Sequence, residues 1–143
     1  MKGKVFFFLL FGFSIGLVAC RSSIKNVMPE IRDADSATII YYEKPQDNRF
    51  FKVVKGKKPR ELATIIEDVN ASAQKYVEAS CESIGKIYFY KGTEQVYVVY
   101  FSAENCSKLA FIKNGERYEA QMSNQSSELL NQLETKAIAP SVR

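Results

Sequence analysis

The sequence predicts an α+β fold, in which an antiparallel sheet of about five strands carries two helices on one face. Two observations predict this fold. Runs of β-branched and aromatic residues separated by turn residues are typical of strands, whereas two other segments repeat apolar residues at the three- and four-residue steps of a helix. The segments follow in the order strand or strands, helix, four strands, helix, which places both helices against an antiparallel sheet.

The first strand-like runs are residues 38–42 and 50–54, with a turn-rich stretch at 44–48 between them. They form either a hairpin or one interrupted strand. Pro59 suits the first position of a helix, and a regular apolar series follows it: Leu62, Ile65, Ile66, Val69 and Ala73. We therefore expect an amphipathic helix after Pro59.

Four further strands are expected at residues 84–90, 96–101, 109–112 and 117–122. Asn-Gly between the last two is a strong hairpin signal. A last helix is expected around residues 125–136, capped by Ser123 or Asn124, with one apolar face formed by Leu129, Leu130 and Leu133. The order is similar to that of the TATA-binding-protein-like fold, in which a helix, a four-strand meander and a second helix follow a first strand. The resemblance concerns architecture and transfers no functional residue.

The first 20 residues indicate export. Lys2 and Lys4 precede an apolar stretch of about 14 residues, whereas a transmembrane helix needs about 20. The stretch ends in Leu-Val-Ala-Cys at residues 17–20, which resembles the bacterial lipobox. The resemblance to a bacterial lipoprotein implies cleavage before Cys20 and attachment of diacylglycerol and a fatty acid such as palmitate. An ordinary secretory signal and an uncleaved N-terminal anchor are the alternatives, and both still export the domain.

These patterns divide the chain into a signal peptide at 1–19, a lipidated Cys and flexible tether at 20–37, one α+β domain at 38–137 and a tail at 138–143. The tether is expected because the stretch is polar and aperiodic and contains Pro29.

The lipid anchor implies an extracytoplasmic location at a cell membrane. Asp directly after the lipidated Cys resembles the inner-membrane retention signal of two-membrane bacteria, and this chain has Arg21 there. In such a bacterium we expect the outer membrane, with the domain facing the periplasm.

The charge of the mature chain argues against a nucleic-acid partner. Removal of Lys2 and Lys4 leaves 18 basic residues against 16 acidic residues, so the formal charge falls from +4 to +2. An excess of only two positive charges does not indicate the basic surface that binds the phosphate backbone of nucleic acids.

The cysteine count predicts one disulfide. If Cys20 carries the lipid, Cys81 and Cys106 are the two remaining cysteines, 25 positions apart in the sequence. In an oxidising compartment outside the cytoplasm we expect them to form a disulfide. Loop closure would contribute about 3.5 kcal/mol. The alternative is a two-thiolate metal or redox site, but the chain has no His and no C-x-x-C to supply the usual ligands and spacing. We therefore expect neither metal nor cofactor.

The sequence favours a protein that is not an enzyme. His, the commonest proton carrier near pH 7, is absent. The carboxylate pairs Asp33/Asp35 and Glu67/Asp68 fall in the expected tether and mostly on the polar side of the first helix. Ser-x-x-Lys occurs three times without the companion motifs of its enzyme families. A small hydrolase with an unrecognised site is the alternative.

A basic cluster precedes the first helix and consists of Lys52, Lys55, Lys57, Lys58 and Arg60. Helix N-termini favour anions, so the cluster could contact lipid headgroups or cell-wall phosphate. The alternative is a solvated turn.

The aromatic residues of the second and third strands suggest a recognition surface. If residues 91–94 form a loop, the face expected under the helices carries Ile87, Phe89, Val96, Val98 and Tyr100. Tyrosine offers a large contact area at a low entropy cost. The opposite face is expected to carry three tyrosines, so it is the candidate binding surface. Its residues are Lys86, Tyr88, Tyr90, Tyr97 and Phe101. Val99 and Gln95 share that face.

We expect this surface to bind an envelope protein or a cell-wall component. A structural or assembly accessory that dimerises through the same face is the alternative, so a monomer and a dimer are both compatible with the sequence. The surface could also be covered by the tether or a loop, or its tyrosines could simply pack across strands.

Overall fold

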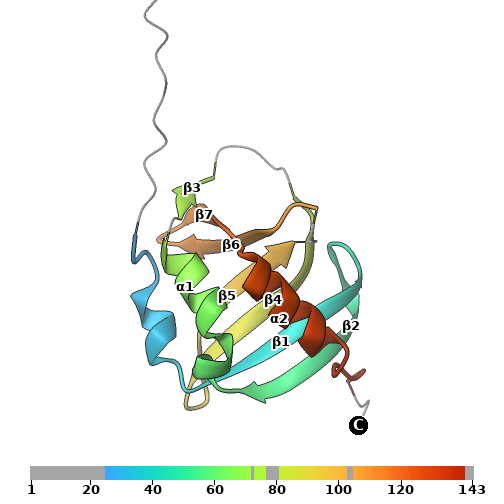
Figure 1. Ribbon diagram of the computed structural model, residues 1–143. Coiled ribbons are helices and arrows are strands. Elements are labelled where there is room, and N and C mark those ends of the chain that lie inside the picture. Colours follow the sequence, from blue (N-terminus) through green and yellow to red (C-terminus); the bar gives the residue numbers. More distant parts are fainter. Residues whose placement is uncertain (1–24, 72, 77–80, 103–104, 141–143) are drawn as a thin grey trace, which may run out of the picture.

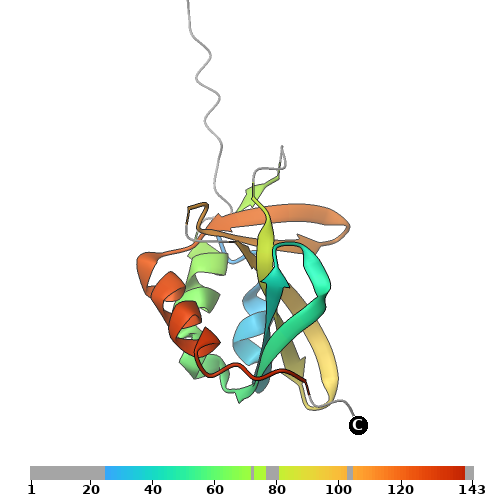
Figure 2. The ribbon, with the colours of Figure 1, turned by 90° about the vertical axis from the view of Figure 1, so that its right-hand side faces the viewer.

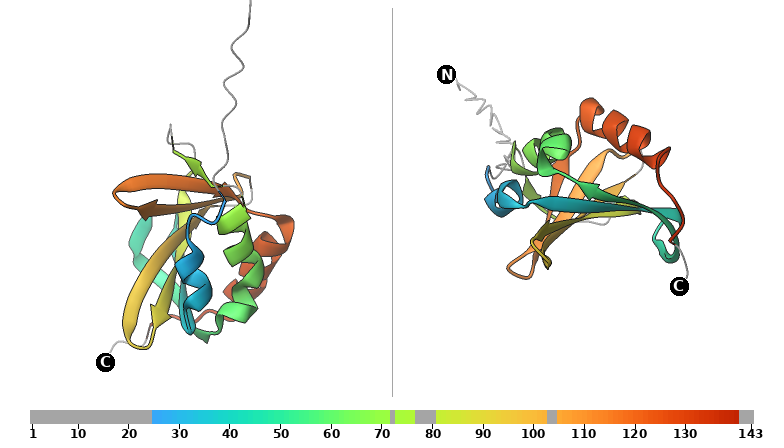
Figure 3. Two further views of the ribbon diagram at one scale, coloured as in Figure 1. Left: turned by 90° about the vertical axis from the view of Figure 1, so that its left-hand side faces the viewer. Right: turned by 90° about the horizontal axis from the view of Figure 1, so that it is seen from below.

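In the computed structural model, which describes residues 25–71, 73–76, 81–102 and 105–140, seven antiparallel strands form one sheet with helices on one face (Figures 1 and 3). The spatial order is β2-β1-β4-β5-β6-β7-β3. The strands are β1 Ser36–Lys44, β2 Asp47–Lys57, β3 Gln74–Lys75, β4 Ser83–Lys91, β5 Glu94–Ser102, β6 Lys108–Lys113 and β7 Glu116–Gln121. The helices are α1 Ala63–Ala71 and α2 Asn124–Glu134, with 3-10 helices η1 Pro29–Asp33 and η2 Pro59–Leu62.

The predicted α+β class, with an antiparallel sheet and two helices, is confirmed, but the sheet has seven strands rather than about five. The first two strand-like runs form a complete hairpin, β1 and β2, which accounts for one extra strand. The other is β3, which pairs with β7 through only two residues. A strand this short is below the length at which an alternating pattern can be recognised.

The helix starts follow the predicted signals. Pro59 opens η2, and the Glu61 carboxylate accepts a 2.8 Å hydrogen bond from the backbone N–H of Lys58. Ser123 caps α2, as its Oγ accepts from the N–H of Ser126 at 3.3 Å. The Asp68 carboxylate of α1 accepts from both the N–H and the Oγ of Ser123, at 2.9 and 2.8 Å. Asp68, one of the carboxylates expected mostly on the polar side of the helix, therefore joins the two helices.

The core lies between the sheet and the helices. Phe89, Phe101 and Phe111 are its largest fully buried side chains. The Tyr41 hydroxyl donates a 2.8 Å hydrogen bond to the carbonyl of Leu130, which ties β1 to α2.

Gly85 is required by close approach within this core. A Cβ atom there would lie 2.2 Å from the ring of Phe101 and 2.3 Å from the carbonyl oxygen of Ile40. Both distances are far inside van der Waals contact.

The N-terminal part of the described chain belongs to the domain, which corrects the predicted tether of residues 20–37. Besides Ala37 at the start of β1, the buried residues there are Val27, Met28, Ile31 and Ala34. The spacing of the last three suits a 3-10 helix, in which positions i and i+3 share a face. The series is too short to stand out as an amphipathic helix, so the polar composition around it was misleading.

The C-terminal boundary is also later than expected. The chain after α2 returns to the sheet (Figure 2), where Ile138 and Val53 exchange backbone hydrogen bonds of 2.8 and 3.1 Å. Ile138, expected in the tail, therefore pairs with β2.

Candidate functional site

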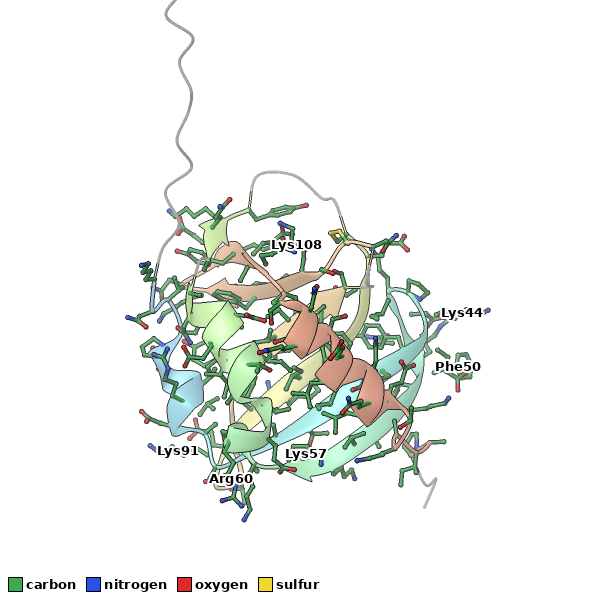
Figure 4. All side chains as sticks on the ribbon, viewed as in Figure 1. Lys44, Phe50, Lys57, Arg60, Lys91 and Lys108 are labelled. Atoms are coloured by element: carbon green, nitrogen blue, oxygen red, sulfur yellow. A yellow bond between two sulfur atoms is a disulfide. The ribbon has the colours of Figure 1, made fainter. Side chains whose placement is uncertain are left out.

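The predicted disulfide between Cys81 and Cys106 is present, with the two α-carbons 6.0 Å apart. This separation lies within the range that disulfides prefer. The bond joins the segment before β4 to the segment before β6 (Figure 4). It therefore fixes one end of the central hairpin.

The register of the hairpin formed by β4 and β5 differs from the expected one. Tyr90 pairs with Gln95 as predicted, but Phe89 pairs with Tyr97, so Val96 is an extra residue. Such a β-bulge exchanges the faces of every residue that follows it.

The placement of Tyr97 and Phe101 on the open face was therefore wrong. Phe101 is 1% exposed in the core, and Tyr97 is half-buried against the core. Tyr100, expected under the helices, instead pairs with Lys86 on the open face. Tyr88 and Tyr90 lie on this face with their ring centroids 6.4 Å apart.

A tyrosine–lysine cluster forms on the open face from Tyr42 of β1, Lys86 and Tyr88 of β4, and Tyr100 of β5. The Lys86 Nζ atom lies 4.9 Å from the ring centroid of Tyr88 and 6.0 Å from that of Tyr42. At these distances an ammonium group is attracted by the faces of the rings.

Lys86 and Tyr42 both keep their protons at neutral pH. Burial alone would lower the pKa of Lys86, but a hydrogen bond to Tyr88 and the neighbouring phenolic groups raise the pKa above its ordinary value. Burial raises the pKa of Tyr42. Lys86 is thus a cation beside the neutral phenol of Tyr42.

A hollow of about 480 Å³ opens beside this cluster. Its volume falls in the range of small-molecule sites, about 300–1,000 Å³. Residues from six strands and from the turn between β1 and β2 line it, including Tyr42, Gln46, Asn48, Tyr100, Ile112 and Arg117. None of the residues that line it is a carboxylate. The hollow therefore offers phenols, amides and a guanidinium group to a ligand.

One wall of the hollow is the turn between β1 and β2, which is docked onto β4. Gln46 has a positive φ of 60°, and its backbone N–H donates a 2.9 Å hydrogen bond to the carbonyl of Ser83. The Asp47 carboxylate accepts hydrogen bonds from the side chain of Arg49, at 2.9 Å, and from its backbone, at 3.1 Å. These bonds lower the pKa of Asp47 to about 2 and link both ends of the Asp47–Arg49 segment beside the turn.

The opposite wall comes from β6 and β7. Arg117 pairs across the strands with Ile112, whose side chain is 61% exposed at the rim. The Arg117 guanidinium lies 4.3 Å from the ring centroid of Tyr76 and 3.7 Å from the Glu119 carboxylate. The guanidinium group is thus held between Tyr76 and Glu119 at the edge of the hollow.

Sequence reasoning found part of this site. It selected Lys86 and Tyr88 of the tyrosine–lysine cluster, but it missed Tyr42 and Tyr100. Tyr42 continues the alternation of Thr38 and Ile40 along β1, which was a signal that could have identified it.

The basic cluster lies away from the hollow. Lys57, Arg60 and Lys91 project at the end of the domain opposite to β3 (Figure 4). Lys57 forms a 3.2 Å ion pair with Glu61, whereas Lys58 and Arg60 are exposed beside η2. The cluster is thus divided between β2, which contains Lys52, Lys55 and Lys57, and the start of η2, and it does not form a single turn.

Within the part of the chain that the structure describes, no helix is both long and apolar enough to span a membrane. The same residues contain no group of three or more Cys, Asp or Glu side chains placed to hold a metal ion.

Comparison of the chain with protein-family models, with curated proteins and with solved structures finds no match.

Proposed function

We propose that this protein is a lipid-anchored binding module of the bacterial cell envelope, with its ligand site in the hollow on the open sheet face. One observation carries the proposal. Helices cover one face of the sheet, whereas the other face keeps a hollow of about 480 Å³ that is bordered by tyrosines, amides and cations.

The shape of the site favours a cell-wall component over a folded protein. A folded partner is usually bound by a broader surface, whereas a hollow of this volume suits a saccharide or a short peptide. Tyr42 and Tyr100 can stack against the apolar faces of sugar rings, and the amides of Gln46 and Asn48 can bond hydroxyl groups. Arg117 can bind a carboxylate in a bidentate manner. A peptidoglycan fragment carries all three kinds of group.

The location proposed from Cys20 is consistent with the covalent structure of the domain. The Cys81–Cys106 disulfide is of a kind that persists outside the cytoplasm. In a bacterium with two membranes, Arg21 supports an outer-membrane location with the domain facing the periplasm.

Calorimetric titration with muropeptides released from peptidoglycan tests the ligand. Tyr100→Ala and Arg117→Gln should each raise the Kd about tenfold or more, which corresponds to about 1.4 kcal/mol of binding free energy. Tyr90→Ala and Arg60→Ala are the matched controls, because these residues are not among those that line the hollow. Both controls should bind as the unsubstituted protein does.

Two results would overturn this proposal. One is that the unsubstituted protein fails to bind muropeptides. The other is that sedimentation shows a dimer that Tyr100→Ala dissociates, because the open face would then be an interface between two copies of the chain.

A further inference from the structure

The first described residues of the chain are fixed to the domain by hydrogen bonds and an ion pair. The backbone N–H of Asn26 donates a 2.8 Å hydrogen bond to the carbonyl of Asn70, near the last residue of α1. The Lys113 ammonium group at the end of β6 donates to the carbonyl of Val27 and forms a 3.0 Å ion pair with Glu30. Lys25 is therefore held next to the C-terminal end of α1 and the turn between β6 and β7.

These contacts define one end of the molecule. We call it the anchor end, and its residues are Lys25, Asn26, Asn70, Lys75, Lys113 and Glu116. Lys75 of β3 and Glu116 of β7 form a 2.8 Å ion pair there. In Figure 1, β3 and the start of the described chain lie together at the top of the domain. Lys57, Arg60 and Lys91 lie at the opposite end (Figure 4).

Only four residues, 21–24, separate Cys20 from Lys25. Whatever conformation they adopt, five α-carbon steps span at most about 18 Å. The tether of residues 21–37 predicted from the sequence would have reached about 60 Å by the same rule. Inclusion of residues 25–37 in the domain thus shortens the reach of the chain about threefold.

The short reach restricts how the domain can lie on a bilayer. A compact domain of this size has a radius of gyration of about 13 Å, and hence a diameter of about 35 Å. If the opposite end touched the bilayer, Lys25 would stand about 35 Å above it, which is twice the distance that the tether can span.

We propose that lipidated Cys20 holds the domain with its anchor end against the lipid headgroups and the end bearing Lys57, Arg60 and Lys91 directed away from the bilayer. This inference depends on the lipid anchor of the proposed function. In this orientation Lys57 and Arg60 of the basic cluster stand away from the headgroups. Arg117 directly follows Glu116 in β7, so one wall of the hollow lies close to the membrane surface.

Tryptophan fluorescence can test the orientation, because the chain contains no Trp. Lys75→Trp places the only indole at the anchor end, and Arg60→Trp places it at the opposite end. Each full-length lipidated protein is inserted into phosphatidylglycerol–phosphatidylcholine vesicles that contain a phospholipid with a nitroxide-labelled headgroup. We expect several-fold stronger quenching for Lys75→Trp than for Arg60→Trp. Equal quenching, or stronger quenching of Arg60→Trp, would overturn the proposed orientation.

A longer tether provides the control. Twenty Gly and Ser residues inserted between Ser23 and Ile24 should remove the difference between the two variants, because the chain could then reach around the domain. A difference that persists in the lengthened chains would overturn the argument from tether length. Co-sedimentation of the protein with vesicles is scored separately. A chain that does not sediment disproves the lipid anchor, whereas a sedimenting chain with equal quenching disproves only the orientation.

Discussion

The side-chain amide of Asn70 forms two hydrogen bonds with the backbone of Met28, although 42 positions separate the two residues. Its Oδ1 accepts from the N–H of Met28 at 2.9 Å, and its Nδ2 donates to the Met28 carbonyl at 3.1 Å. A third bond, from Nδ2 to the carbonyl of Ile66, orients the amide. Asn70 is 2% exposed, so these bonds are shielded from water. This one side chain joins the N-terminal segment to the end of α1.

Asn70→Ala should lower the free energy of unfolding by about 1–3 kcal/mol, because it leaves buried backbone groups of Met28 without partners. Urea unfolding followed by circular dichroism measures the change. Asn124→Ala at the exposed start of α2 is the control and should change stability by less than about 0.5 kcal/mol. Equal effects of the two substitutions would contradict the role given to Asn70.

Replacement of both Cys81 and Cys106 by Ala should cost about 2–4 kcal/mol of unfolding free energy. The unsubstituted protein should lose a similar amount when it is unfolded in the presence of a reductant, and the double variant should be insensitive to reductant. Either single replacement should leave a thiol that forms intermolecular dimers, visible on a non-reducing gel. Equal stability of the oxidised and reduced forms would show that the bond contributes nothing.

The Asp47 carboxyl should titrate near pH 2 in the folded protein, below its ordinary value of 3.8. Because the folded pKa is lowered, the stabilisation from this group is complete above about pH 4 and is lost as the pH falls towards 2. Carboxyl-detected NMR titration checks the value. Arg49→Ala removes the hydrogen-bond donor and should return the pKa towards 3.8. A midpoint near 3.8 in the unsubstituted protein would mean that the turn is not held by this pair.

Cys20→Ala should abolish labelling by radioactive palmitate and leave exported protein that is unprocessed or not attached to the membrane. Substitution of Ser22 by Ala, two positions away, is the control and should leave labelling unchanged. Label that persists in Cys20→Ala would refute the lipobox. Fractionation of a two-membrane host should place the unsubstituted protein in the outer membrane, and residence in the inner membrane would contradict the inference from Arg21.

The elements that could be predicted are those with a strong local signal. The four runs from residue 84 to 122 carry β-branched and aromatic residues between turns, and all four are strands. Ser123 caps α2 because its position directly before an apolar repeat is a local feature. The disulfide followed from counting cysteines.

The face of β5 could not be predicted, because its residues show almost no alternation. Residues 96–101 are Val, Tyr, Val, Val, Tyr and Phe, so either register buries apolar side chains. The bulge at Val96 then decides which tyrosine faces solvent. The hollow was missed for a related reason: it joins Gln46, Tyr100 and Arg117 from segments far apart in the chain.

The burial of Met28 and Ile31 bears on whether this domain can be shed from a membrane. Both side chains are fully enclosed by the core. A protease that cut the chain between Ile31 and β1 would detach part of that core, and loss of buried apolar side chains costs several kcal/mol, comparable with the whole stability of a domain. Intact release from a lipidated Cys20 would therefore have to occur before Met28. Cleavage farther along the chain would destroy the domain instead of liberating it.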